Sequence, residues 1–122
     1  MKFMCLAYEA EETFTTMSPE EWSALRDETL AYVDALQKSG RLVMTNALQG
    51  ARTASMVRVR SNEVIISDGP FAETKEQIGG FFLIEAKDKT EALEIASKWP
   101  GARFGNIEVR PVEESLRVEG RY

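Results

Sequence analysis

Residues 78–86 read Ile78-Gly79-Gly80-Phe81-Phe82-Leu83-Ile84-Glu85-Ala86, and this apolar run predicts a strand that is buried on both faces. Phe81 and Leu83 alternate with Phe82 and Ile84, so each face receives large apolar side chains. The run Lys2–Tyr8 has the same pattern. Strands of this kind lie in the middle of a sheet, so we expect these two to be central and to need cover on both faces.

Capping signals predict two helices around these strands. Ser18, Pro19 and Glu21 form a helix start, and Gly40 can take the left-handed conformation that ends the helix. The second predicted helix is capped by Asp88 and ends at Pro100-Gly101.

The remaining segments predict strands and loops. We expect strands over Leu42–Leu48, Ser55–Arg60, Glu63–Ser67 and Asn106–Val112, with a tight hairpin turn at Ser61-Asn62. The acidic, Thr-rich segment Glu9–Met17 is expected to be a surface loop. This order predicts an α+β fold, a ferredoxin-like split βαβ sheet with an added β-hairpin. The domain would span residues 1–114, followed by a C-terminal tail, 115–122.

Two helices can cover only one face of such a sheet, although both central strands are apolar on both faces. The uncovered face is therefore expected to pack against a second copy in a homodimer. Stacking the two sheets would form a dimeric α/β barrel.

Composition excludes several classes of function. The net charge of -5 argues against nucleic acid as a partner, because such binding needs a basic surface. Apolar runs fall short of the roughly 20 residues that cross a membrane. With one cysteine, Cys5, and no histidine, we expect no disulfide, metal or other cofactor and a cytoplasmic location.

The segment Ile66–Phe81 contains Asp68-Gly69-Pro70-Phe71 and resembles the DGPF motif of the YCII-related domain family. Glu108-Val109-Arg110-Pro111-Val112 is similar to the closing strand of that family, and the resemblance runs from Met1 to about Glu114. It implies a dimeric α/β barrel related in fold to muconolactone isomerases. Some relatives are thought to act on chlorinated or hydroxylated ring compounds by proton transfer or dehydrochlorination. Proteins of the DGPF type are also associated with extracytoplasmic-function sigma factors, which implies an accessory role as the alternative.

Asp68 is the candidate catalytic residue. It would act as a general base at a strand end, where desolvation raises the pKa of a carboxylate. The alternative is an Asx-turn residue that binds nearby backbone amides before Gly69-Pro70. In relatives proposed to be catalytic, a histidine accompanies this aspartate, whereas Phe104 stands near the position where that histidine is often found.

Three further residues are candidates for binding a substrate. Lys75 would bind an anionic group, or form a surface ion pair with Glu73. Arg110 would clamp a carboxylate, or form a structural salt bridge with Glu108. Tyr8 would add a hydroxyl to the cleft under the sheet that Asp68 is expected to face, or simply pack with its tip in water.

Two functions of different classes follow. The first is a cofactor-free lyase or isomerase that acts on a small cyclic anionic compound, with Asp68 as base and Arg110 or Lys75 as anchor. The second is a non-catalytic dimeric module that binds a small ligand or a protein such as a sigma factor. The absence of histidine favours the second.

Overall fold

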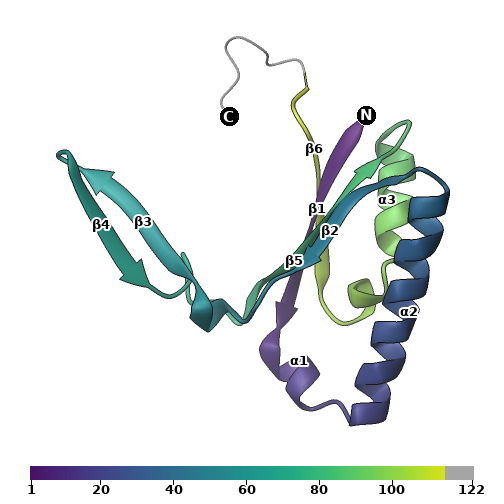
Figure 1. Ribbon diagram of the computed structural model, residues 1–122, viewed down its shortest axis with the longest axis horizontal. Helices are drawn as coiled ribbons and strands as arrows, with labels where there is room; N and C mark the ends of the chain where they lie inside the picture. Colours follow the sequence, from purple (N-terminus) through teal and green to yellow (C-terminus); the bar gives the residue numbers. More distant parts are fainter. Residues whose placement is uncertain (115–122) are drawn as a thin grey trace.

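The computed structural model describes residues 1–114, whose centre is a four-stranded antiparallel sheet in the order β2-β5-β1-β6 (Figure 1). The strands are β1 (Lys2–Ala10), β2 (Leu42–Ala47), β5 (Glu76–Glu85) and β6 (Asn106–Pro111). The two predicted central strands pair with each other, and Cys5 lies opposite Phe82. The predicted α+β, ferredoxin-like fold is therefore confirmed.

Two helices, α2 (Pro19–Lys38) and α3 (Lys89–Ser97), cover one face of this sheet (Figure 1). The short helix η2 (Pro100–Arg103) follows α3 and brings Trp99 against the sheet, where its ring stacks on Phe82 with 3.9 Å between centroids. Within residues 1–114 no helix covers the opposite face, which we call the open face. The core lies on the helix side and comprises Phe3, Cys5, Leu36, Phe82, Ile84, Ala86, Ala92, Ile95 and Ala96.

The predicted capping signals are confirmed. The Ser18 hydroxyl accepts a bond of 3.1 Å from the Glu21 amide, and the Glu21 carboxylate accepts one of 3.2 Å from the Ser18 amide. Gly40 ends α2 with φ of +74°. The Asp88 carboxylate accepts a bond of 2.9 Å from the Glu91 amide at the start of α3. Local side-chain chemistry thus sets the ends of both large helices.

The added hairpin forms a separate two-stranded sheet of β3 (Ser55–Arg60) and β4 (Glu63–Asp68). Its turn consists of Ser61 and Asn62 with φ of 51° and 64°, the two positive values of a type I′ turn, which confirms the predicted turn. The hairpin follows the short helix η1 (Ala51–Thr53) and projects away from the body on the side opposite α2 and α3 (Figure 1). We call residues 55–68 the arm.

The loop predicted over Glu9–Met17 is wrong in part. Strand β1 continues to Ala10, and α1 (Glu11–Thr15) follows it. Glu11 and Glu12 occupy the first turn of α1, where the helix dipole favours negative charge, and the Thr16 hydroxyl donates to the Glu12 carbonyl at 2.9 Å. Threonine has a low helix propensity, so the sequence of this segment does not indicate a helix.

Other boundaries differ by one or two residues. β4 ends at Asp68 rather than at Ser67, and β5 begins at Glu76 rather than Ile78. The predicted tail, residues 115–122, lies outside the described residues. No helix in the described part of the chain is long and apolar enough to span a bilayer.

Candidate functional site

A row of small residues crosses the helix-facing side of the sheet. Ala7 of β1 lies opposite Gly80 of β5, and Gly80 lies opposite Ala47 of β2. The next row towards the core is Cys5, Phe82 and Thr45. Because the small row lacks large side chains, the sheet cannot fill the space beneath the N-terminal half of α2.

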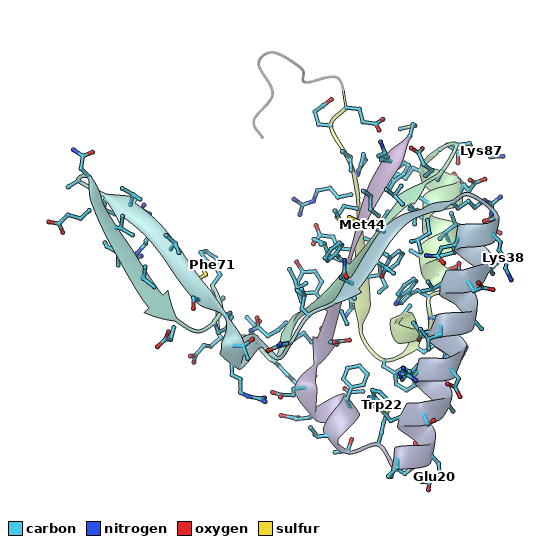
Figure 2. The ribbon with its side chains drawn as sticks, viewed as in Figure 1. Glu20, Trp22, Lys38, Met44, Phe71 and Lys87 are labelled. Atoms are coloured by element: carbon cyan, nitrogen blue, oxygen red, sulfur yellow. The ribbon has the colours of Figure 1, made fainter. Side chains whose placement is uncertain are left out.

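This space is an apolar cavity of about 740 Å³, which we call the chamber. Leu25, Thr29 and Val33 of α2 are only half-buried there, although they recur at helical spacing on one side of that helix. Trp22 also lines it from α2 (Figure 2). Aromatic and aliphatic side chains thus surround a space large enough for a small ring compound.

A second, more polar cleft of about 1020 Å³ adjoins the chamber. It lies among α1, the base of the arm and the loop 69–75, and we call it the cleft. Gln77 anchors this loop by donating to the carbonyls of Ala72 at 2.7 Å and Thr74 at 3.0 Å. The two cavities share Glu9, Phe14, Leu48 and Gly79.

Glu9 lies at the junction of the chamber and the cleft. Its carboxylate occupies the space beside Gly79, where a Cβ atom would be 1.7 Å from Glu9 Oε1. Gly79 is the extra residue of a bulge, since Ala7 pairs with Gly80 and Tyr8 pairs with Ile78. Burial raises the pKa of the Glu9 carboxyl, which has no side-chain hydrogen bond or ion pair within residues 1–114.

Two of the predicted site residues lie in the cleft. Asp68 and Lys75 both line it and are both exposed, Asp68 at the end of β4 and Lys75 in the loop that follows. Lys75 has no ion-pair partner in the described part of the chain, so the alternative surface pair with Glu73 does not form there. The cleft therefore presents the Asp68 carboxylate and the unpaired ammonium group of Lys75.

The other two predicted residues lie on the open face of the sheet. Tyr8 donates its hydroxyl to Glu108 at 3.2 Å, and Arg110 Nε donates to the same carboxylate at 3.1 Å. The bond from Arg110, followed by that from Tyr8, lowers the pKa of Glu108. Within one chain, the structure does not bring Arg110 and Tyr8 into the cleft with Asp68.

Comparison with known proteins identifies the family. Residues 1–115 match the YCII-related domain. The chain belongs to the YCII-related family. An uncharacterised protein of Rhizobium meliloti (strain 1021) is 34% identical over 114 residues, which cover 92% of each chain. The family resemblance expected from the sequence is therefore confirmed, whereas membership of the DGPF subgroup stays a prediction.

A solved structure shares the fold of this YCII-related chain. It is 5-chloro-2-hydroxyhydroquinone dehydrochlorinase (TftG) from Burkholderia phenoliruptrix AC1100, in complex with 2,5-dihydroxybenzoquinone. The TM-score is 0.57 at 16% sequence identity, over 93% of this chain and 94% of TftG. At this identity the likeness shows the fold alone.

Glu9 is the site residue that sequence reasoning missed in this YCII-related chain. Phe3, Cys5, Ala7 and Glu9 alternate along β1, so Glu9 continues the face that is buried under the helices. A charged residue in such a position, facing a strand with two consecutive glycines, is the available signal. This signal can be interpreted only with the bulge at Gly79, and the sequence alone does not show where that bulge lies.

Proposed function

We propose that this chain is a cofactor-free lyase or isomerase that acts on a small cyclic anionic compound. The observation that carries the proposal is the position of Glu9, a half-buried carboxylate with a raised pKa between an apolar chamber and a polar cleft. A carboxyl group whose pKa is raised by burial can hold or accept a proton nearer neutral pH. The substrate ring would occupy the chamber, and its anionic group would face Lys75.

Two carboxyl groups divide the proton transfer in this proposal. Asp68 would act as the base and remove a proton from the substrate, and Glu9 would act as the acid. In an isomerisation, the electron pair of the broken C–H bond moves into the ring, and Glu9 returns a proton at another ring atom. In an elimination, the same electron pair forms a double bond and a leaving group such as chloride departs with its bonding electrons.

The dehydrochlorinase named above supports a ring compound as the ligand class. TftG has the same fold and was solved with a small quinone. The chamber, with walls that include Trp22, Trp99 and Phe82, offers aromatic faces against which a planar ring can stack. No step of the proposed reaction requires a metal or an organic cofactor, because carboxyl groups alone move the proton.

A homodimer in the cytoplasm is part of the proposal. The open face carries Met4, Leu6, Met44, Phe81 and Leu83 on three adjacent strands, and no other part of residues 1–114 covers them. Stacking this face on that of a second copy would remove these side chains from water and complete a dimeric α/β barrel.

Ligand binding and turnover test the proposal. The wild-type protein is screened by thermal shift with 2,5-dihydroxybenzoquinone and with hydroxylated and chlorinated ring acids, because a ligand that binds the folded state raises the melting temperature. Turnover of each binder is followed by ultraviolet absorbance and, for chlorinated compounds, by chloride release. We expect Glu9→Gln and Asp68→Asn each to lower kcat by about 10²- to 10⁴-fold, the range for loss of a general acid or base.

Glu63→Gln is the matched control, since Glu63 lies on the arm at the end remote from Asp68. We expect it to retain wild-type kcat. Wild-type rates in both Glu9→Gln and Asp68→Asn would overturn the assignment of the proton transfer. A screen in which no ring compound raises the melting temperature would overturn the substrate class.

The second candidate function is a non-catalytic dimeric accessory module, such as one linked to an extracytoplasmic-function sigma factor. The absence of histidine from all 122 residues favours it, because the usual neutral-pH base is missing. Ligand binding without turnover, together with co-purification of a sigma factor with the wild-type protein, would support this function over the first.

A further inference from the structure

Arg26 of α2 lines the chamber, and no acidic side chain of residues 1–114 forms an ion pair with it. Glu9 is the other charged residue that the described part of the chain contributes to the chamber, and it approaches from β1 of the sheet. The apolar chamber therefore has one basic and one acidic group on different walls. Each of them is free to contact a ligand.

The sequence around Arg26 explains why it is unpaired. Charged side chains on a helix pair with residues three or four positions away. Near the end of α2, for example, Lys38 pairs with Asp34 at 2.8 Å. The positions three and four residues before and after Arg26 hold no acid; they are Trp22, Ser23, Thr29 and Leu30. The guanidinium of Arg26 therefore has no partner on its own helix and remains available to a bound anion.

The chamber opens to water next to Arg26. Trp22 and Leu30, one helical turn on either side of Arg26, line the chamber but are 48% and 51% exposed. Leu48, which follows β2, also lines it and is 50% exposed. Because β2 is an edge strand, no further strand of the central sheet covers this side within residues 1–114. We call Trp22, Leu30 and Leu48 the mouth of the chamber, and a ligand that enters there passes the Arg26 guanidinium.

Arg26 and Lys75 would contact different ends of a ligand. Arg26 lines the chamber but not the cleft, whereas Lys75 lines the cleft but not the chamber. Glu9 lies between them, at the junction of the two cavities. A ring held in the chamber against Trp22 would therefore have one edge toward Arg26 and the other toward Glu9 and the cleft. A planar guanidinium binds a carboxylate through two parallel hydrogen bonds, which suits a carboxylate attached to a flat ring.

We propose that Arg26 binds an anionic group of the ring compound at the mouth of the chamber and that the preferred ligands are rings with two anionic groups. The first group would face Arg26, and the second would face Lys75. A ring of this class gives both cations a partner, whereas a ring with one anionic group can pair with only one of them. The inference rests on the proposed function for the position of the ring, but it assigns a role to a residue that the proton transfer does not use.

Matched ring acids test the proposed class of ligand. Isophthalate and terephthalate are benzene dicarboxylates, and the mono-amide of each replaces one carboxylate with an uncharged group of almost the same shape. By isothermal titration, we expect wild type to bind at least one dicarboxylate about fivefold more tightly than its mono-amide, which is the upper end of the range for an exposed ion pair. A wild-type protein that binds neither dicarboxylate more tightly than its mono-amide would overturn the proposal.

Arg26→Gln and Arg58→Gln are a matched pair of variants. Both arginines are exposed and lack an ion-pair partner in the described part of the chain, but Arg58 lies on the arm and lines neither cavity. We expect Arg26→Gln to bind the dicarboxylate and its mono-amide equally, and Arg58→Gln to keep the wild-type preference. A preference that survives Arg26→Gln would overturn the role of Arg26. Glutamine has nearly the helix propensity of arginine, and circular dichroism checks that the helix content is unchanged.

Chemical modification of the wild-type protein tests the contact without any substitution. Phenylglyoxal reacts with exposed guanidinium groups, and mass spectrometry of the peptides measures the rate of modification at each arginine. A saturating concentration of the dicarboxylate that binds more tightly should slow the modification of Arg26 several-fold and leave that of Arg58 unchanged. Equal rates at Arg26 with and without the dicarboxylate would show that the ligand does not contact this guanidinium, and would overturn the proposal.

These experiments can fail independently of the proposed function. Titration and phenylglyoxal modification need no turnover, so a protein with no catalytic activity can still confirm that Arg26 selects ring dianions. Conversely, an Arg26→Gln variant that turns over a ring compound with the wild-type kcat/KM would leave the proposed function intact and remove the role of Arg26.

Discussion

A Cβ atom on Gly79 would lie 1.7 Å from Oε1 of Glu9, so the glycine provides the space that this carboxylate occupies. A Cβ atom at this position would also lie 2.9 Å from Cγ of Glu9. The relationship couples a backbone bulge in β5 to the position of Glu9, which within residues 1–114 is the one carboxyl group that lines both cavities.

Gly79→Ala is expected to displace the Glu9 side chain and to weaken ligand binding at the junction as much as Glu9→Ala does. The free energy of unfolding should change by at most about 1 kcal/mol, since alanine also restricts the unfolded chain and the displaced group is a movable side chain. Isothermal titration with the ring compound found in the screen measures binding. In a double-mutant cycle, adding Glu9→Ala should cause no further loss. Additive losses would show that Gly79 does not act through Glu9.

Gly105→Ala should behave differently, because the obstacle there is backbone. A Cβ atom on Gly105 would lie 2.1 Å from the carbonyl oxygen of Tyr8, which belongs to a central strand. We expect a loss of about 1–3 kcal/mol in the free energy of unfolding, as for other overpacked positions. Urea denaturation measures it. A change below that range would mean that β1 and β6 separate more easily than their pairing indicates.

The pH dependence of stability tests the burial of Glu9. A raised pKa means that the folded chain binds the Glu9 proton more tightly than the unfolded chain does. Ionised Glu9 therefore destabilises the fold above its folded-state pKa, and this cost disappears as the pH falls below the unfolded value of about 4.3. Glu9→Gln should be more stable than wild type at neutral pH, with a difference that shrinks towards about pH 4.

Comparing the two proteins by urea denaturation at each pH isolates Glu9 from other acids. Arg103 lowers the pKa of Glu28, and Arg110 lowers that of Glu108, so both acids contribute stability that is lost as the pH falls. These contributions are the same in wild type and in Glu9→Gln. A difference that grows at acidic pH would have the wrong sign for a buried, unpaired Glu9.

Much of the fold was predictable because its signals are local. Ser18 and Glu21 complete a capping box, Gly40 ends a helix, and Ser61-Asn62 forms a hairpin turn within a few residues of chain. The alternation in β1 and β5 also identified the central strands, since both faces carry large apolar residues. Each of these features is a property of one segment and needs no knowledge of its neighbours.

The site was less predictable because it depends on pairing between distant segments. Glu9 faces the chamber only because β5 bulges at Gly79, and the chamber exists only because Ala7, Gly80 and Ala47 fall into one row of three strands. Asp68 and Arg110 were expected to share a cleft, yet the arm places Asp68 near α1 while Arg110 lies on the open face. Residue types alone do not determine the direction in which the arm leaves the sheet.

A larger side chain on the sheet side of the chamber should block ligand binding without unfolding the protein. Ala47 belongs to the row of small residues and lies on β2, an edge strand, so Ala47→Leu would extend into the chamber. Titration should show no binding of the ring compound, while the melting temperature stays at or above that of wild type, because the added side chain fills an existing space. Ala47→Ser, which adds little volume, should bind as wild type. Wild-type binding by Ala47→Leu would place the ring outside the chamber.

Lys75 provides the final prediction. Of the cations that line the cleft within residues 1–114, Arg52 is paired with Glu11, whereas Lys75 is in no ion pair. Lys75→Gln should raise the Kd of a ring acid about 1.4- to fivefold, because an exposed ion pair contributes about 0.2–1 kcal/mol. Lys87→Gln, a substitution of an exposed lysine that does not line the cleft, should leave the Kd unchanged. The effect of Lys75→Gln should shrink in high salt, which screens exposed charges, and should be absent for an uncharged ring of the same shape. Equal Kd values for the acid in wild type and Lys75→Gln would place its charged group away from the loop 69–75.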